Sequence, residues 1–285
     1  MCYIPVKKLL KDEGIVMNFK KLTSCVVAGL FAVGVSAMTL PAANVEAADS
    51  PYCATVEQVA PEGGFFFDFS KKMPKEAVAA HGWTNGAMFD TNWYKDNITF
   101  NSKRMQLNLD NEDGPGWSDP TVNYSGAEFR TTTQNRYHYG LYEVCMKPAK
   151  SDGIVSSFFT YTGPYDEPKT QWDEIDIEFL GKDTTKAQFN YFTDSKGNHE
   201  YLCDLGFDAS EGFHVYAFDW QPGSITWYVD GKEVYKATDN IPVTPSMVMA
   251  NLWAGRGVDE WLNQVDDSNF PVQAEYKWMK FTPAK

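Results

Sequence analysis

Short segments rich in aromatic and β-branched residues, separated by turn signals, fill the sequence from about residue 63 onward. They read RMQLNLD, YGLYEVCMK, VSSFFTYT, DEIDIEFL, AQFNYFTD, HVYAFDW, SITWYVD, KEVYKAT and AEYKWMKFT. Several alternate with period two, as β-strands do, and Asp230-Gly231 between two of them predicts a tight hairpin. A helix of one or two turns is expected only at PKEAVAAHG, residues 74–82. The pattern predicts an all-β fold, an antiparallel β-sandwich without a second domain.

The size and composition agree with one large sandwich. The chain has 285 residues, of which 43% are hydrophobic and 15% aromatic. A chain of this kind can bury a sizeable core, and all-β domains often reach this length. We therefore expect residues 49–285 to form a single domain. The high aromatic share suits both a β core and a sugar-binding surface.

Residues 1–48 are expected to lie outside the fold. From Met17, a short basic region (MNFKK) precedes an apolar run (LTSCVVAGLFAVGVSAMTL) and a small-residue cleavage pattern at Ala47 or Ala48. This order predicts a secretory signal peptide, a true start at Met17 and an extracellular mature protein. A membrane anchor is the alternative, but Thr, Ser and Gly interrupt the run and no second span follows. A second alternative is a lipoprotein, because LTSC, ending at Cys25, resembles a lipoprotein cleavage box. Such a box follows the apolar run, whereas LTSC comes before it.

Charge and cysteine content narrow the partners and the chemistry. The formal net charge of −13 disfavours binding to nucleic acid or anionic membranes and suits a neutral partner. Cys53, Cys145 and Cys203 follow the predicted cleavage site, so at most one disulfide can form among them. The sequence has no CxxC pair, and its four histidines lack metal-ligand spacing, so we expect no metal site.

The stretch QWDEIDIEFLG places three acids, Glu174, Asp176 and Glu178, at alternating positions. In a strand these acids share one face, and the apolar residues between them share the other. Their Cα atoms would lie roughly 6 to 7 Å apart, with no Lys or Arg between them to relieve the repulsion. The acidic face therefore requires an explanation.

Three interpretations fit such a face. A solvated strand would mix Lys or Thr among the acids, and a calcium site would need the Asp, Asn and Gly spacing of a calcium loop. Glycoside hydrolysis needs one ionised and one protonated carboxyl group, and close like charges separate their pKa values in this way. Glu174 and Glu178 would be about 13 Å apart at Cα on a flat strand. The spacing alone therefore leaves a retaining or an inverting mechanism open.

Aromatic residues also occur where a sugar polymer could stack on them, in SFFTYTGP, WDE, FNYFT and NLWAGRGVDEW. Core packing is the alternative for each of them. Trp253 and Trp261 flank Gly255 and Gly257 in a stretch that we expect to be a loop. A large aromatic side chain has less structural reason to be there.

Four longer stretches resemble a known family. WDEIDIEFLGKDTTKAQFNYFT, YGLYEVCMKPAKSDGIVSSFFTYTGP, GFHVYAFDWQPGSITWYVDGKEV and NLWAGRGVDEWL closely resemble the bacterial licheninases, the β-1,3-1,4-glucanases of glycoside hydrolase family 16. The resemblance runs from about Gly63 to Lys285. It implies a jelly-roll β-sandwich with a concave substrate cleft and retaining cleavage of β-1,4 bonds that follow a β-1,3-linked glucose. The implied partner is a mixed-linkage β-glucan such as lichenan or cereal β-glucan; we expect a monomer that requires no cofactor.

The resemblance also implies roles for single residues. Glu174 corresponds to the nucleophile, Glu178 to the general acid/base and Asp176 to an assisting residue. The implied sugar contacts are Asn85, Glu128, Arg130, Phe159, Tyr161, Trp172, Asn190, Phe192, Asn251, Trp253 and Trp261. For Arg130 beside Glu128, an ordinary surface ion pair is the alternative.

Rival activities within the same fold remain to be separated. Laminarinase-like relatives insert a bulge residue between the positions of Asp176 and Glu178, and this chain does not. Xyloglucan-active relatives carry a sugar-attachment sequon after the acidic strand, where this chain reads LGKDTT. A noncatalytic carbohydrate-binding sandwich is the alternative from another class, but a pure binder has no need for a repelling acid pair.

The chain departs from the family pattern at three places. Phe192 stands where the family usually has Tyr, which removes one hydroxyl group. The family disulfide positions align with Thr91 and Gly126, so that bridge is absent. The family's structural calcium uses an Asp where this chain has Lys277, and we expect no calcium to bind there in the same way.

Overall fold

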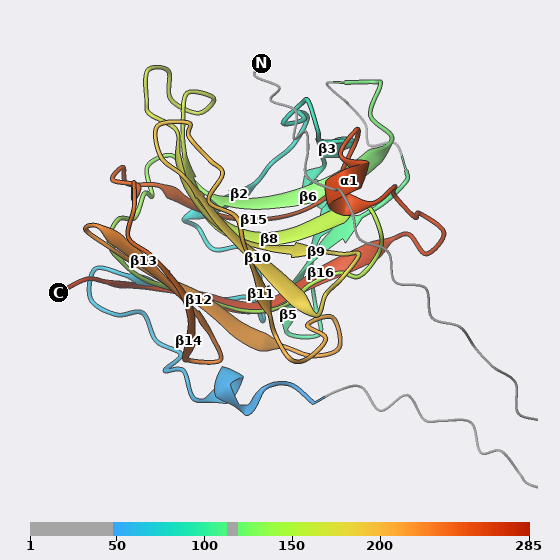
Figure 1. Ribbon diagram of the computed structural model, residues 1–285. Helices are drawn as coiled ribbons and strands as arrows, with labels where there is room; N and C mark the ends of the chain where they lie inside the picture. The colour runs from blue at the N-terminus through green and yellow to red at the C-terminus, as the bar shows by residue number, and fades with distance from the viewer. Residues whose placement is uncertain (1–47, 113–118) are drawn as a thin grey trace, which may run out of the picture. The chain divides into compact units, whose positions relative to one another are not determined.

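Two sheets packed face to face make up the fold (Figure 1). A computed structural model describes residues 48–112 and 119–285. Sheet A contains β1 (Phe65–Asp68), β4 (Ile98–Asn101), β5 (Arg104–Leu109), β7 (Gly140–Lys147), β12 (His214–Gln221), β13 (Ser224–Val229), β14 (Lys232–Ala237) and β16 (Val272–Pro283). Its order is β14, β13, β12, β7, β16, β5, β4, and β1 pairs with β16.

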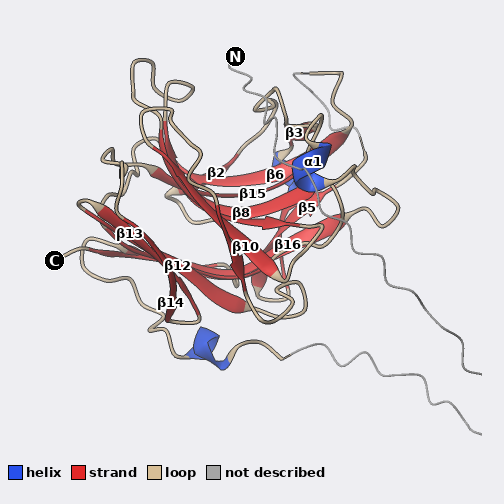
Figure 2. Cartoon of the chain, in the orientation of Figure 1, coloured by secondary structure: helices blue, strands red, loops and turns tan. Residues whose placement is uncertain are grey.

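Sheet B forms the second layer. It contains β2 (Ala77–Ala79), β3 (Thr91–Trp93), β6 (Tyr124–Thr131), β8 (Ile154–Thr162), β9 (Asp173–Leu180), β10 (Lys186–Phe192), β11 (Tyr201–Asp204) and β15 (Met247–Ala254). Its order is β11, β10, β9, β8, β15, β6, β2, with β3 parallel to β6. Helical turns among the described residues are short: η1 (Pro51–Ala54), η2 (Lys95–Asn97) and α1 (Asp259–Leu262) (Figure 2). The predicted antiparallel β-sandwich is confirmed.

The core lies between the two sheets, where the apolar face of each strand is buried. Ile175, Ile177 and Phe179 of β9 are completely buried there. The ring of Phe179 meets that of Tyr216 from β12 edge-on, with centroids 4.7 Å apart. Each fully buried large side chain contributes roughly 1.5 to 3 kcal/mol to the free energy of unfolding. The buried face of β9 therefore fixes which of its side chains point outward.

The predicted Asp230-Gly231 hairpin is confirmed as the turn between β13 and β14. Both residues have positive φ, 48° and 74°, as a two-residue type I′ turn requires. A Cβ at Gly231 would also lie 2.6 Å from the ring of Tyr52. Glycine is thus required here both by the turn and by the close approach of an aromatic ring.

Two local expectations are wrong. Residues 74–82 do not form a helix; instead β2 pairs with β6, with Ala77 opposite Thr131. Pairing with a neighbouring strand outweighs the helix propensity of Ala and Glu. Trp253 is not in a loop, because β15 continues to Ala254. The only helix-like turn in that region is α1, which carries Trp261.

The chain enters the fold through an N-terminal arm, residues 48–56. The backbone N–H of Ser50 donates to the carbonyl of Phe213 at 2.8 Å, and Lys277 pairs with Asp49. The predicted signal peptide and the start at Met17 lie outside the described residues. Among residues 48–112 and 119–285, no helix is long and apolar enough to span a membrane.

Candidate active site

The acids Glu174, Asp176 and Glu178 lie on the outer face of sheet B, which points away from the core. Ile175 and Ile177, which alternate with them, are in the core. The prediction that the three acids share one face of a strand is therefore confirmed. Asp176, in the middle, is 4% exposed, while its two neighbours remain partly accessible.

The strand register gives each acid a partner on both sides. On β10 the residues opposite Glu174, Asp176 and Glu178 are Phe192, Asn190 and Gln188. On β8 the corresponding residues are Tyr161, Phe159 and Ser157. Because residues opposite each other share a face, six side chains surround the acids on the same outer surface. Four of the six were predicted as sugar contacts.

Glu174 is held by Trp172. The indole Nε1 of Trp172 donates to Oε2 of Glu174 at 2.5 Å, and its ring stacks on Phe192 with centroids 5.0 Å apart. Burial raises the pKa of Glu174 to about 7, and the charge of Glu178 acts in the same direction. The hydrogen bond from Trp172 opposes this rise, because it stabilises the carboxylate.

Asp176 links the two glutamates electrostatically. Burial, followed by the charges of Glu174 and Glu178, raises its pKa well above the usual range. A hydrogen bond between Asp176 and Glu174 also raises the pKa of Asp176 and lowers that of Glu174. This bond favours the ionised form of Glu174, the form that a nucleophile needs.

Glu178 has a different environment. Burial raises its pKa to about 7, and Gln188 opposes the rise by donating from Nε2 to Oε2 at 2.7 Å. The other end of Gln188 is fixed, since its Oε1 accepts a hydrogen bond from Nε1 of Trp261 at 3.1 Å. Trp261 thus acts on Glu178 through Gln188.

Another carboxyl group, that of Glu128 on β6, lies on the same surface three strands away from β9. It is 3% exposed, and burial raises its pKa to about 7 against the opposing charge of Arg130. Asn251 lies opposite it on β15, and both Asn251 and Asn85 hydrogen-bond to it. Ser157 fixes Asn251 by donating to its Oδ1 at 2.6 Å.

Arg130 is not an ordinary surface residue. Its guanidinium group pairs with Glu128 at 3.5 Å and with Asp166, and its side chain is 11% exposed. The surface ion-pair alternative is therefore wrong, because both Arg130 and Glu128 are largely buried. Arg130 also lies 5.8 Å from the ring of Trp83.

The buried Oδ1 of Asn190, next to Asp176 on β10, has no hydrogen-bond partner among the described residues. A buried acceptor without a partner costs roughly 1 to 3 kcal/mol. A ligand hydroxyl group at this position would remove the cost.

The predicted aromatic contacts differ in accessibility. Trp253 is 2% exposed and packs against Phe89, with ring centroids 4.0 Å apart, in a small cluster that includes Leu262 of α1. The structure therefore uses its ring mainly for packing. Phe159 is 8% exposed, whereas Tyr161, Trp172 and Trp261 are half-buried and border the acids.

Two residues of the surface were missed by the sequence predictions, Gln188 and Ser157. Gln188 lies two residues before Asn190 and four before Phe192. The period of two within β10 could therefore have predicted that Gln188 shares their face of the strand. Ser157 precedes Phe159 and Tyr161 in the same way. Neither residue type is specific enough to be chosen without its neighbours.

Comparison with known proteins agrees with this arrangement. Residues 85–280 match the family described as glycosyl hydrolases family 16. The chain belongs to this family. It is therefore a glycoside hydrolase, and the match to the family fold confirms the jelly-roll type of sandwich.

Individual relatives of this family 16 glycoside hydrolase are closely similar. The "Beta-glucanase" of Paenibacillus macerans is 56% identical over 204 residues, covering 71% of this chain and 81% of the relative. A "Xylanase/beta-glucanase" of Ruminococcus flavefaciens is 52% identical over 75% of this chain, which corresponds to only 26% of that relative's length. A crystal structure of a prokaryotic β-1,3-1,4-glucanase (lichenase) from a mouse hindgut metagenome is 52% identical, with a TM-score of 0.72 over 78% of this chain and 99% of that one.

Proposed function

We propose that this chain is an endo-β-1,3-1,4-glucanase that hydrolyses β-1,4 bonds next to β-1,3 linkages with retention of configuration. The observation that carries the proposal is the environment of the two outer acids on β9. Trp172 donates to Glu174, and the hydrogen bond between Asp176 and Glu174 also lowers the pKa of Glu174, while Gln188 is the one hydrogen-bond donor to Glu178 among the described residues. Two hydrogen bonds thus stabilise the carboxylate of Glu174 and one stabilises that of Glu178, which supports Glu174 as the nucleophile and Glu178 as the acid of a retaining mechanism.

In the proposed mechanism Glu174 attacks the anomeric carbon while Glu178 protonates the oxygen of the leaving sugar. The products of this step are a covalent glycosyl-enzyme, a free sugar end and an ionised Glu178. Glu178 then takes a proton from water, and the resulting nucleophile releases Glu174. We propose that Asn190, Glu128, Arg130 and Asn251, which share this surface, bind sugar hydroxyl groups.

The register of β9 supports a mixed-linkage specialist. Asp176 and Glu178 pair with Asn190 and Gln188 in a continuous register, without an extra residue between them. The resemblance associates a bulge at this position with laminarinases. The names of the similar β-glucanases and of the lichenase point to the same substrate class.

The test replaces each outer acid by its amide. Glu174→Gln and Glu178→Gln should each lower the hydrolysis of barley β-glucan by at least about a hundredfold, since each removes one chemical step. Glu233→Gln, at an exposed position of β14 in sheet A, is the control and should keep full activity. Reducing-sugar release measures the loss, and circular dichroism checks the fold. Activity within tenfold of wild type in either site variant would contradict the proposal.

Two further measurements distinguish the proposed activity from an inverting mechanism and from activity on laminarin or xyloglucan. Proton NMR of the first products should show the β-anomer, because double displacement retains configuration. A comparison of lichenan, laminarin and xyloglucan should show activity on lichenan far above the other two. An α-anomer would favour an inverting mechanism. Activity on laminarin equal to that on lichenan would contradict the proposed specificity for mixed-linkage glucans.

We also propose that the protein is secreted as a monomer. The support is the signal-peptide pattern from Met17 and the acidic net charge of −13. N-terminal sequencing of protein from the culture medium should give a first residue near Ala47 or Ala48. Sedimentation should give a single species with the mass of one chain.

We propose further that no structural calcium binds at the position of Lys277. The ammonium group there pairs with Asp49 and lies 4.2 Å from the centre of the Phe213 ring. Arg104 and Lys147 lie nearby and both pair with Glu275, at 2.6 and 2.8 Å. A divalent cation would meet three positive charges and carboxylates that are already paired, so these residues do not fit calcium.

A further inference from the structure

Two cysteine sulfur atoms that are distant in sequence lie in contact on the outer face of sheet A. Cys53 is in η1 of the N-terminal arm and Cys145 is in β7, 92 residues later. Their Sγ atoms are 3.0 Å apart, closer than two sulfur atoms in ordinary van der Waals contact. A disulfide bond would require them to approach by about a further 1 Å.

The fold brings the two sulfur atoms together through contacts of their neighbours. Ser50 donates to the carbonyl of Phe213 at 2.8 Å, and the backbone N–H of Phe213 donates to Asp49 at 3.2 Å. Lys277 from β16 pairs with the same aspartate. Noncovalent contacts with Phe213, which precedes β12, and with β16 therefore align the N-terminal arm with sheet A.

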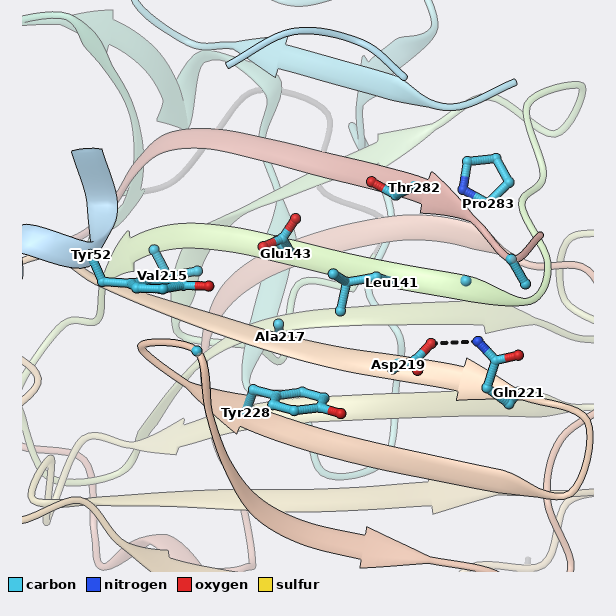
Figure 3. A pocket seen from close by; sticks show the side chains of 13 residues that line it. Tyr52, Leu141, Glu143, Val215, Ala217, Asp219, Gln221, Tyr228, Thr282 and Pro283 are labelled. Carbon is cyan, nitrogen blue, oxygen red and sulfur yellow. Dashed lines mark hydrogen bonds between the residues drawn. The ribbon is translucent and has the colours of Figure 1, made fainter. Parts of the chain in front are cut away.

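The side chains packed against the sulfur atoms are apolar. Cys145 is fully buried and Cys53 is 8% exposed, and they pack with Phe213, Val215 and Trp278. Figure 3 shows Tyr52, next to Cys53 in sequence, lying beside Val215 on this face, where it lines a cavity of 300 Å³. The hydrogen bond to Cys53 and burial raise the pKa of the Cys145 thiol well above its ordinary value, against the opposing charge of Lys277, so the thiol is not activated for catalysis. No cluster of three or more metal-binding side chains exists among the described residues.

We propose that Cys53 and Cys145 form a disulfide bond in the exported protein, which fastens the N-terminal arm to β7. Cys203 remains a thiol, because it lies in β11 of the other sheet, where its Sγ contacts the carbonyl of Asp204 at 3.7 Å. The inference rests on the export that is part of the proposed function, since disulfides form in oxidising compartments. It does not depend on the substrate.

The bond forms by thiol–disulfide exchange with a disulfide donor, either an extracytoplasmic oxidoreductase or a small-molecule disulfide. One cysteine thiolate attacks the donor disulfide, and a mixed disulfide forms as one donor thiol leaves. The second cysteine then attacks its partner sulfur and releases the other donor thiol. Both protein thiols lose a proton, the protein is oxidised by two electrons, and the donor is reduced to two thiols. Since both sulfur atoms are buried in the fold, the exchange takes place before the arm docks.

The first test maps the thiols directly. Protein from the culture medium, and the same chain refolded with reduced and oxidised glutathione, is denatured with an alkylating agent without reductant and then digested. Mass spectrometry should find label on Cys203 and a cross-linked peptide pair that joins Cys53 to Cys145. Label on both Cys53 and Cys145 in the refolded sample would overturn the proposal. If the refolded chain forms the bond but the protein stays inside the cells with Cys53 and Cys145 labelled, the result would contradict export and not the pairing of the two cysteines.

The second test measures what the bond does. Reduction should lower the melting temperature by on the order of 10 °C, because the bond closes a long loop of the unfolded chain. Cys53→Ala should melt at the temperature of reduced wild type and should not respond to reductant. Cys203→Ser is the matched control and should keep the full response. An equal response to reductant in Cys53→Ala and wild type would overturn the proposal, as would no response in wild type.

Activity on β-glucan provides a separate readout. The arm packs on sheet A, whereas Glu174 and Glu178 lie on the outer face of sheet B. Cys53→Ala and the reduced wild type should therefore keep wild-type turnover at 25 °C and lose it at lower temperatures than the oxidised form. If the oxidised wild type contains the disulfide but has no activity on β-glucan, the result would contradict the proposed function and not the disulfide.

Discussion

Among single residues, Trp172 has the most direct influence on the chemistry of the proposed nucleophile. Its indole N–H donates to Glu174, and its ring stacks on Phe192, which holds it in place. The hydrogen bond lowers the pKa of Glu174 against the larger effect of burial. Phe192 can perform this stacking without the hydroxyl group that the family usually has at its position.

Trp172→Phe should keep the aromatic ring and remove only the donor. The pKa of Glu174 then rises, and because Glu174 must be ionised to attack, the acidic limb of the kcat/KM profile should move to higher pH by about one unit. The pH dependence of barley β-glucan hydrolysis measures this shift. Trp261→Phe is the contrast, because it loosens Gln188 and should raise the pKa of Glu178, which moves the basic limb upward instead. An unchanged acidic limb in Trp172→Phe would contradict the assignment.

At the scale of secondary-structure elements, alternation within a strand was visible in the sequence, and pairing between strands was not. The alternating acids of β9 predicted their shared face, and Gln188 followed the same period. Glu128 and Asn251, in contrast, meet only because β6 pairs with β15. No local pattern links residues so far apart, and only the family resemblance suggested both.

Each element that the sequence predictions missed has a physical reason for being missed. Every residue of β15 is buried, so the strand lacks the apolar and polar alternation that marks a half-exposed strand. The strands β1, β3, β4 and β11 have only three or four residues, too few for a period to show. The mistaken helix at 74–82 formed an edge strand because β6 offered a partner.

Two hairpin glycines allow an element-scale experiment. Gly223, before β13, and Gly231, before β14, have similar φ values of 82° and 74°. A Cβ at Gly223 meets nothing within 4 Å, whereas one at Gly231 meets the Tyr52 ring at 2.6 Å. Gly223→Ala should lower the free energy of unfolding by about 1 kcal/mol from the backbone alone, and Gly231→Ala by about 1 kcal/mol more. Urea unfolding measures both; equal losses would mean that Tyr52 moves without cost.

For the whole molecule, the acidic surface makes stability depend on pH. The folded-state pKa values of Glu174 and Glu178 are raised to about 7, above the ordinary value of 4.5. The folded protein therefore binds more protons than the unfolded chain between these pH values. Each group adds stability that is fully present below about pH 4.5 and is lost as the pH rises through 7.

Glu174→Gln and Glu178→Gln should each remove part of this dependence. The free energy of unfolding of wild type should fall relative to either variant between pH 5 and pH 7.5, by about 1 to 3 kcal/mol. Urea titrations at the two pH values measure the difference. Glu233→Gln should follow wild type, because Glu233 is exposed. Parallel curves for wild type and both site variants would show that the glutamates have ordinary pKa values in the folded protein.

The positive cluster around Phe213 leads to a second expectation for the whole molecule. Because Lys277 and its neighbours do not fit a divalent cation, neither a chelator nor added calcium should change the melting temperature by more than about 1 °C. Lys277→Met should lower it, since Asp49 then loses its partner. Differential scanning calorimetry measures both effects. Stabilisation by millimolar calcium in wild type would indicate a cation site elsewhere in the chain.

The position of β16 in sheet A has a consequence for biosynthesis. This strand, residues 272–283, pairs with β1, β5 and β7, so it joins the two halves of the sheet. A nascent chain in which β16 has not yet emerged from the ribosome has two unpaired strand edges in place of one continuous layer. The sandwich can therefore close only after synthesis has passed residue 283. Until then sheet A lacks its connecting strand, so the secretion proposed above can begin on a chain whose sandwich is incomplete.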